Sequence, residues 1–374
     1  MRPVKRIFNA ITIRVGIVGT SLWADSMYAP ALAQHPLAEV VAVCGRDLER
    51  TRTFATRWNI PNAYTDYQEM IGAGGLDAII IATSNDSHYP ITMAALDACL
   101  HVLCEKPLAL NFTQAQAMAD KATSLGLKNM VPFTYRYMPT NRYLKQLIDD
   151  DYIGQPYHLN MRYYADYGRE AKYQWVFDSD VAGAGVIADL GAHWFHLSRW
   201  FFGEIVGLSC ILTDLVKRPN APDGRDYPRA DDTAMVTVRF ESGAFGALML
   251  STVAWEGTKF GQTQHMEFHG SNGTLYSSVD WDTLQEVRGI SAGQRGGAQP
   301  LPIPDAPWGD ARRDTVHNTY RDIFRQQNHM AREFITAIAD DKPVYPDFAE
   351  GARVQQLIDA AVSSAKAGGC WVTV

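Results

Sequence analysis

Short apolar runs alternate with amphipathic stretches along the first third of the chain. The runs are rich in β-branched residues and end at glycine or at polar residues, which is typical of buried strands. Strands that are apolar on both faces need cover on both sides, so this region predicts a parallel sheet between helices, as in a doubly wound nucleotide-binding domain. The expected strands are 11–18, 39–44, 77–82, 101–104 and 128–133, and the expected helices end near 34 or span 48–58, 90–98 and 113–124.

The pattern changes after about Pro132. Longer runs now alternate polar and apolar positions, and glycine turns such as Ser242-Gly243 join one run to the next. Consecutive strands with tight turns predict a mostly antiparallel sheet in a second domain. The expected strands are 233–240, 244–253 and 264–269, the expected helices are 141–150, 188–200, 328–339 and 350–367, and the Gly- and Pro-rich segment 289–307 is expected to be a surface loop.

The predicted fold class is therefore α/β with two domains. Residues 1–132 are expected to form the doubly wound dinucleotide-binding domain, and residues 133–374 an α/β domain with a large open-faced sheet for substrate binding and assembly. The two-residue alternation places one face of the second sheet against helices. Since exposed apolar sheet faces are poorly tolerated, we expect a second copy of the chain to cover the other face.

Composition restricts the class of protein. The 374 residues are 47% apolar and 20% charged, as in a globular protein, and the net charge of −7 argues against a nucleic-acid partner. No apolar run is long enough to span a bilayer. Five cysteines without paired metal spacing predict a reducing cytoplasm and no metal site. The basic segment 1–10 lacks the apolar core of a signal peptide, and we interpret it as an extension or as the result of a misassigned start codon.

The segment from Gly19 to Ala24 joins the first strand to the first helix. It occupies the place of the dinucleotide fingerprint G-x-G-x-x-G/A, but it keeps only the first and last small residues and has Ser21 in the middle. A helix N-terminus there offers free amides and partial positive charge to a pyrophosphate. We therefore expect Gly19, Thr20, Ser21 and Leu22 to bind a dinucleotide. The alternative is a plain turn between strand and helix.

The end of the second strand indicates which dinucleotide is bound. NAD-binding folds place an acid about 20 residues past the glycines, where it binds the ribose hydroxyls. This chain has Gly45 and then Arg46. Because an arginine binds a 2′-phosphate through paired hydrogen bonds, we favour NADP(H). The alternative is NAD(H), with Asp47 in the place of the acid.

Polar residues also follow the third strand. Thr83, Asn85 and His88 lie there, and we expect them to bind the cofactor, with Thr83 and Asn85 along the nicotinamide ring. A structural role is the alternative, because Asn and Ser are common helix caps.

The fourth strand ends in Cys104-Glu105-Lys106-Pro107. A proline disfavours helical geometry in the residue before it, so Lys106 is held extended. Ligands of open α/β sheets lie at this end of the strands. We therefore expect Lys106 to point into the crevice, with Glu105 beside it to hold its charge and with both residues near the cofactor.

Three titratable residues follow at helical spacing, namely Asp189, His193 and His196. On one helix they share a face. A histidine can move a proton near neutral pH, and a carboxylate four residues away can orient it and raise its basicity. We therefore expect Lys106, Asp189 and His193 to be catalytic. The alternatives are a buried structural histidine and a metal site, for which no further ligand pair is present.

Aromatic and basic residues gather upstream of this helix. Aromatic rings stack on the C–H faces of sugars, and basic groups bind hydroxyls or acids. We assign Arg136, Tyr164, Trp175 and His196 to substrate binding, and the alternative is a strand with aromatic cross-strand pairs. Asp231-Asp232 is expected to cap a turn before a strand, without a role in the site.

Taken in order, these motifs resemble the glucose-fructose oxidoreductase, inositol dehydrogenase and rhizopine catabolism (Gfo/Idh/MocA) family over nearly the whole chain. The resemblance implies a Rossmann domain followed by an α/β domain with a large open sheet, usually assembled as dimers or tetramers. It also implies that Lys106 is the active-site lysine, with Asp189 and His193 as partners. The motifs are the Gly19 turn, Thr83-Ser84-Asn85-x-x-His88, Glu105-Lys106-Pro107, Arg136 and Gly185-x-x-x-Asp189-x-Gly191-x-His193.

The sequence departs from the family pattern at Ser21, at Ser84 where proline is common, and at His196 where many members have aspartate. The family implies an NAD(P)-dependent enzyme acting on a secondary alcohol, or the matching ketone, of a sugar, sugar derivative or cyclitol. In that reaction His193 takes the hydroxyl proton, Asp189 orients His193 and Lys106 polarises the oxygen, and the lysine and histidine could exchange roles. Two alternatives are an enzyme that retains its cofactor and uses transient oxidation for elimination or glycoside hydrolysis, and a non-catalytic sugar-sensing regulator.

Overall fold

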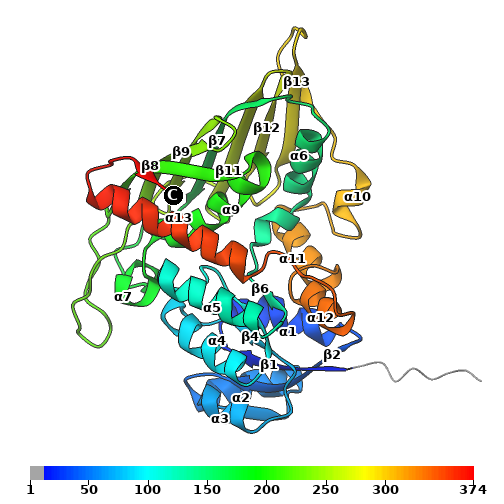
Figure 1. Cartoon of the computed structure of the whole chain (residues 1–374), viewed down its shortest axis with the longest axis vertical. Helices are drawn as coiled ribbons and strands as arrows, with labels where there is room; N and C mark the ends of the chain where they lie inside the picture. Colours follow the sequence, from blue (N-terminus) through cyan, green and yellow to red (C-terminus); the bar gives the residue numbers. More distant parts are fainter. Residues whose placement is uncertain (1–11) are drawn as a thin grey trace, which may run out of the picture.

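The computed structural model describes residues 12–374, and the chain forms two units with one large sheet in each (Figure 1). The start of the predicted first strand at residue 11 and the basic segment 1–10 lie outside the described residues.

The first unit contains a six-stranded parallel sheet in the order β3-β2-β1-β4-β5-β6. The strand order reverses between β1 and β4, so their carboxyl ends form the switch point at which open α/β sheets bind ligands. All four residues of β4 are fully buried, as expected for a central parallel strand. The strands are β1 Ile13–Val18, β2 Ala38–Cys44, β3 Asn62–Tyr64, β4 Ala78–Ile81, β5 His101–Cys104 and β6 Asn129–Met130.

Side-chain caps fix the starts of the helices between these strands. Asp47 accepts a hydrogen bond from the amide of Arg50 at the start of α2, and Asn111 accepts one from Gln114 at the start of α5. The predicted parallel sheet between helices is confirmed. β6 is shorter than expected because the amide of Val131 donates to the carbonyl of Pro346 and the next residue, Pro132, has no amide to donate. The helices are η1 Ala24–Tyr28, α1 Ala29–Ala33, α2 Leu48–Trp58, α3 Tyr67–Gly72, η2 Asn85–Ser87, α4 His88–Asp97 and α5 Phe112–Ser124.

The second unit contains a nine-stranded sheet in the order β14-β13-β12-β11-β7-β10-β9-β8-β15. Among the described strands, β7 and β10 pair in parallel and the other pairs are antiparallel, so the mostly antiparallel sheet is confirmed. The strands are β7 Pro156–Ala165, β8 Ile205–Thr213, β9 Thr233–Phe240, β10 Phe245–Ser251, β11 Gln262–Gly270, β12 Gly273–Val279, β13 Gln285–Ser291, β14 Gln299–Pro300 and β15 Val372–Thr373.

Two expectations for the second unit are corrected. The predicted helix 188–200 is two helices, α8 and α9, that meet at Leu190. The predicted loop 289–307 contains the end of β13, the short edge strand β14 and a helical turn, because ladder hydrogen bonds recruit its first residues into the sheet. The helices are η3 Thr134–Tyr137, α6 Pro139–Asp149, η4 Trp175–Phe177, α7 Ser179–Ala182, α8 Val186–Asp189, α9 Gly191–Phe202, α10 Asp305–Trp308, α11 Val316–Gln326, α12 Ala331–Ala339 and α13 Phe348–Lys366.

The last helices of the chain return to the first unit. There the guanidinium of Arg325 donates to the carbonyl of Ser26 at 2.7 Å, and that of Arg332 donates to the carbonyl of Ala31 at 2.9 Å. α13 lies across both units because it packs on α5 and on β8 (Figure 1). Segments far apart in the sequence therefore fix the position of one unit against the other.

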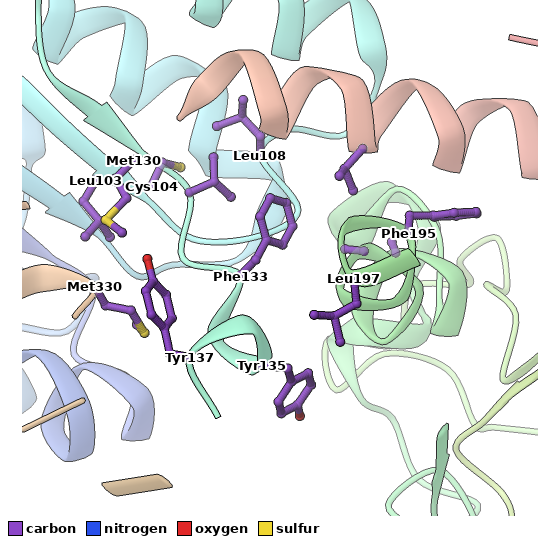
Figure 2. Close-up of a cluster of buried hydrophobic side chains, with 14 of the residues drawn as sticks. Leu103, Cys104, Leu108, Met130, Phe133, Tyr135, Tyr137, Phe195, Leu197 and Met330 are labelled. Atoms are coloured by element: carbon purple, nitrogen blue, oxygen red, sulfur yellow. The ribbon is translucent and has the colours of Figure 1, made fainter. Parts of the chain in front are cut away.

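Phe133 joins the cores of the two units. Its side chain is fully buried and lies between Leu108 of the first unit and Phe195 and Leu197 of α9 (Figure 2). The same ring stacks on the imidazole of His196 with centroids 4.4 Å apart. This packing holds α9 beside the carboxyl ends of the parallel strands.

The nine-stranded sheet has one covered face and one open face. Helices α8, α9 and α13 pack on the covered face. The open face carries Ile211, Met235 and Phe245, whose side chains are 58%, 51% and 60% exposed, and Ile211 pairs with Met235 across β8 and β9. No helix within residues 12–374 combines the length and apolar character that a membrane span requires.

Candidate active site

Lys106 and Asp189 form an ion pair between the two units. Lys106 follows β5, and the amide of Glu105 extends that strand by donating to the carbonyl of Ile81 at 3.0 Å. The Lys106 Nζ donates to Asp189 Oδ1 at 2.6 Å and to the Asp189 carbonyl at 3.1 Å. The lysine side chain is 18% exposed and the aspartate side chain 29% exposed, so the pair can be reached from solvent.

Asp189 is held on its other side by Tyr167, whose hydroxyl donates to Oδ2 at 2.5 Å. Burial raises the pKa of Asp189, but the charge of Lys106 and the hydrogen bonds from Lys106 and Tyr167 outweigh burial and lower it. The two carboxylate oxygens are thus engaged by Lys106 and Tyr167 instead of His193. This corrects the expectation that Asp189 orients His193, because the break at Leu190 lets the carboxylate turn to Lys106.

His193 lies beside this pair with 5% of its surface exposed. Its ring centroid is 4.4 Å from that of Tyr135, and its buried Nδ1 has no hydrogen-bond partner within residues 12–374. Burial lowers the pKa of His193 well below its usual range, and Lys106 and His196 add to this effect. His193 is therefore neutral at pH 7. A buried nitrogen without a partner is costly, and a ligand hydroxyl or a water would relieve that cost.

Glu105 lies behind the ion pair and contacts the backbone of Lys106. Its carboxylate accepts hydrogen bonds from the hydroxyl of Tyr28 and from the Lys106 amide, the latter at 3.2 Å. Burial raises the pKa of Glu105, although these hydrogen bonds and the lysine charge oppose the shift. Glu105 thus braces the lysine backbone, while Asp189 holds the lysine charge, which corrects the role expected for Glu105.

The turn after β1 packs closely against the end of β4. Gly19 has a φ of +112°, and a Cβ there would lie 2.3 Å from the carbonyl of Ala82. The Ser21 hydroxyl donates to the same carbonyl and accepts from the amide of Ala24, both at 3.2 Å. Ser21 therefore closes the turn against β4, and the side chain of Leu22 is exposed. These positions would hold a dinucleotide through backbone amides.

Two guanidinium groups lie near the end of β2. A Cβ at Gly45 would lie 2.5 Å from a side-chain oxygen of α2, so an acid cannot replace this glycine without moving the helix. The Oδ1 of Asp47 accepts from the amide of Arg50 as the cap of α2. Arg46 is exposed, and the guanidinium of Arg50 donates to the carbonyl of Thr20 at 2.7 Å.

The residues after β4 brace loops instead of facing an open crevice. The Asn85 side-chain amide donates to the carbonyl of Ala182 at 3.0 Å. His88 is fully buried, with Nδ1 2.9 Å from the carbonyl of Pro107 and Nε2 3.3 Å from the carbonyl of Thr83. His88 therefore ties the two loops together, which corrects the expectation that it contacts a cofactor directly.

His196 belongs to a buried network. Its Nδ1 lies 2.8 Å from the carboxylate of Glu350, and its Nε2 accepts from the guanidinium of Arg136 at 3.1 Å. That guanidinium also lies over the rings of Trp200 and Tyr345 at 4.7 and 4.8 Å. Because both nitrogens are engaged and the ring is fully buried, the expected substrate contact of His196 is corrected to a structural one.

The predicted substrate aromatics are separated by strand alternation. Tyr164 faces the open side of the sheet under the guanidinium of Arg162, which corrects its expected substrate contact, whereas its neighbour Tyr163 points to the covered side. The hydroxyls of Tyr163 and Tyr135 are 2.6 Å apart. Trp175 lies in η4 and is 43% exposed. The sequence prediction assigned no role to Tyr135, Tyr163 or Tyr167. A strand over 156–165 would have placed Tyr163 on the covered side.

Comparison with known proteins identifies the family. Residues 13–133 match the model of an oxidoreductase family with an NAD-binding Rossmann fold, and residues 141–276 match the GFO/IDH/MocA C-terminal domain. The two matches together cover more than half of the chain. The chain belongs to the GFO/IDH/MocA family. The resemblance drawn from the motifs is thereby confirmed, and this oxidoreductase has the expected Rossmann unit followed by a second, mostly antiparallel sheet.

Several relatives of this oxidoreductase are sugar dehydrogenases. It is 28% identical to levoglucosan dehydrogenase from Pseudarthrobacter phenanthrenivorans over 92% of this chain and 91% of the relative. It is 25% identical to D-glucoside 3-dehydrogenase from Escherichia coli over 98% and 99% of the two chains. A structure of levoglucosan dehydrogenase in complex with NADH and levoglucosan superimposes with a TM-score of 0.85 at 25% identity, over 97% of this chain and 99% of that one.

No group of three His, Cys, Asp or Glu side chains within residues 12–374 is arranged to hold a metal ion.

The buried His196 network makes stability depend on pH. Burial lowers the pKa of His196 from 6.5 to about 4, so the folded state binds this proton less readily than the unfolded state. The free energy of unfolding is therefore highest above pH 6.5, and this group lowers it as the pH falls through about 4. For one group the slope is at most about 1.4 kcal/mol per pH unit. We expect His196→Gln, which can replace both hydrogen bonds without titrating, to flatten this dependence. Urea unfolding at pH 7 and pH 4.5 measures it, and equal slopes in the two proteins would contradict the prediction.

Proposed function

We propose that this oxidoreductase transfers a hydride between a nicotinamide cofactor and a secondary alcohol, or the matching ketone, of a sugar-like ring. The observation that carries the proposal is the meeting of Lys106 with Asp189 at 2.6 Å at the carboxyl ends of the parallel strands. Beside this pair lies His193, whose Nδ1 has no hydrogen-bond partner within the described residues. A cation, a fixed carboxylate and a proton acceptor in one place are the groups that alcohol oxidation needs.

Each of these residues has a role in the proposal. The Lys106 ammonium stabilises negative charge on the substrate oxygen, and Asp189 with Tyr167 fixes the position of that ammonium. His193 accepts the hydroxyl proton, because its lowered pKa keeps it unprotonated at pH 7. The nicotinamide, when bound, supplies the hydride acceptor or donor. The close turn at Gly19 and the helix N-terminus after it fit the pyrophosphate of such a cofactor.

A sugar or sugar derivative is the proposed substrate class. Relatives named for levoglucosan, D-glucoside and myo-inositol dehydrogenation support this class. The aromatic residues around His193 also support it, because flat rings pack against the C–H faces of sugars. The ring of Tyr135 lies 5.8 Å from that of Trp281, whose indole Nε1 is buried and has no partner within the described residues. That N–H would donate to a ring or hydroxyl oxygen of the substrate.

NADP(H) is the proposed cofactor. Arg46 is an exposed guanidinium at the place where a ribose 2′-phosphate would lie, and one oxygen of Asp47 caps α2. NADH in the levoglucosan dehydrogenase structure makes NAD(H) the alternative.

We propose that two or four copies assemble through the open face. Ile211, Met235 and Phe245 on this face are each more than half exposed, and a second copy would bury them. We also propose a reducing cytoplasmic location, because all five cysteines are unpaired and three of them are buried.

Variants of the three catalytic residues test the chemistry. We expect His193→Ala to lower turnover by about a hundred- to ten-thousand-fold, the range of general acid–base catalysis, with cofactor affinity nearly unchanged. Lys106→Ala should lose as much or more. Tyr167→Phe should lose activity through Asp189, whereas the matched change Tyr164→Phe on the open face should not. Steady-state assays over a panel of sugars and cyclitols, with net cofactor turnover as the readout, measure this. Near-normal turnover in His193→Ala would remove that residue from the mechanism.

Arginine substitution tests the cofactor. We expect Arg46→Ala to weaken NADPH binding by roughly 10- to 100-fold, because a hydrogen bond to a charged group is worth about 1.5–3 kcal/mol, and to leave NADH binding unchanged. Arg52→Ala, an exposed arginine of α2 away from the β2 end, is the control. Fluorescence titration with both cofactors measures the effect. If the unaltered protein binds NADH at least as tightly as NADPH, the inference from Arg46 is wrong.

Charge on the open face tests assembly. We expect Ile211→Lys combined with Met235→Lys to convert the assembly to monomers, because paired ammonium groups cannot be buried in an apolar interface. Leu125→Lys, at a residue 44% exposed in the first unit, should leave the mass unchanged. Light scattering at micromolar concentration gives the masses. A monomeric mass for the unaltered chain would contradict the proposal.

A further inference from the structure

Asp231 contacts the segment that carries Asp189. Its Oδ1 accepts from the amide of Gly185 at 3.0 Å, and its Oδ2 accepts from the amide of Ile187 at 2.9 Å. Its main-chain carbonyl accepts from the amide of Val186 at 2.8 Å. One buried residue from the segment before β9 thus binds three consecutive amides at the start of α8.

The short helix α8 depends on this support. A helix of four residues cannot hold itself, because forming a first turn fixes several dihedral angles for little hydrogen bonding. Gly185, the residue before it, has no side chain to cap it. Asp189, the last residue of α8, donates its amide to the Gly185 carbonyl at 2.9 Å. The carboxylate that meets Lys106 is therefore one helical turn away from the amides that Asp231 holds.

The segment at Gly185 and the segment at Asp231 are packed too closely to admit a further side chain. A Cβ on Gly185 would lie 1.8 Å from the main-chain carbonyl oxygen of Asp231, so a side chain cannot be added there without separating the two segments. The neighbouring Asp232 is directed elsewhere, with one oxygen accepting from the amides of Leu215 and Val216. The two neighbouring acids thus bind different segments, and only Asp231 binds the amides at the start of α8.

We propose that Asp231 is a positioning residue of the hydride-transfer site, which fixes α8 so that the Asp189 carboxylate meets the Lys106 ammonium. This inference rests on the proposed function. The mechanical reason is that three amides bound to one rigid residue set both the place and the direction of a short helix. A displacement of about 1 Å in a catalytic group costs on the order of a hundred-fold in rate.

Burial disfavours the charge of Asp231, and its contacts with the α8 amides compensate for this. Burial raises its pKa to about 6, the two amides oppose the shift, and the charge of Asp232 adds to it. The Tyr167 hydroxyl and the Cys210 thiol also lie within its electrostatic reach. A carboxylate kept in a place that disfavours its charge needs a compensating contact, and the α8 amides are that contact. Asparagine keeps the shape but turns an N–H toward one of those amides.

Asp231→Asn is the first test. We expect turnover to fall by about 10- to 100-fold with NADPH affinity within about two-fold of the unaltered enzyme, because α8 shifts while the Rossmann turn stays in place. We also expect faster amide hydrogen exchange over 185–189 and unchanged exchange over β1 and β4. The second readout needs no substrate, so it tests the placement of α8 even if no sugar in the panel is turned over, which would instead count against the proposed function.

A matched control separates positioning from general destabilisation. The Asp322 carboxylate is also buried and accepts from the amide and guanidinium of Arg312, far along the chain from α8. We expect Asp322→Asn to lower the melting temperature at least as much as Asp231→Asn, yet to leave turnover and exchange over 185–189 unchanged.

Gly185→Ala attacks the same contact from the other side, which keeps the inference testable if Asp231→Asn fails to fold. The same loss of turnover and the same local exchange are expected, and the double variant should be little worse than the worse single one, because both break one contact. Normal turnover in Asp231→Asn, unchanged exchange over 185–189, or an equal loss of turnover in Asp322→Asn would each overturn the proposal.

Discussion

The ion pair between Lys106 and Asp189 is the interaction on which the rest of the site depends. It joins the end of a parallel strand in one unit to a short helix in the other. A partly buried pair contributes to function only when both charges are held in place, since either one alone would be left uncompensated. The structure holds the aspartate with Tyr167 and braces the lysine backbone with Glu105. The proposed mechanism therefore requires the two units to be docked accurately before hydride transfer.

Much of the polar structure around the pair fixes the backbone. His88 ties the loop after β4 to the loop after β5 through two carbonyl groups. Ser21 closes the turn after β1 onto Ala82. These residue types suggested ligand contacts when seen in the sequence, yet their polar atoms are engaged by the protein. Buried polar groups need partners, and in a site made of loops the nearest partners are main-chain atoms.

Burial keeps the two histidines of α9 uncharged. His193 and His196 are both kept neutral at pH 7, one beside a cation and one between Arg136 and Glu350. Burial raises the pKa of Glu350, but its contacts with His196 and Arg199 outweigh burial and hold it at about 2. His196 thereby acquires a fixed structural partner, whereas the Nδ1 of His193 has no hydrogen-bond partner within residues 12–374. They are three positions apart on one helix, and only their surroundings make them different.

The sequence by itself determined the alternation of strands and helices in the first unit apart from β3 and α3, the place of Lys106 at a strand end and the antiparallel character of the second sheet. These features follow from local patterns, because burial on both faces, alternation and proline restriction act on neighbouring residues. The sequence could not determine which polar atoms face the crevice. Tyr163 and Tyr164 differ only by strand alternation, and the sequence offered a strand there only as the alternative to substrate binding. The partners of Asp189, His196 and Asp231 lie tens to hundreds of residues away in the chain. Only the tertiary structure decides such pairings, because they depend on how the two units pack and not on any pattern within one segment.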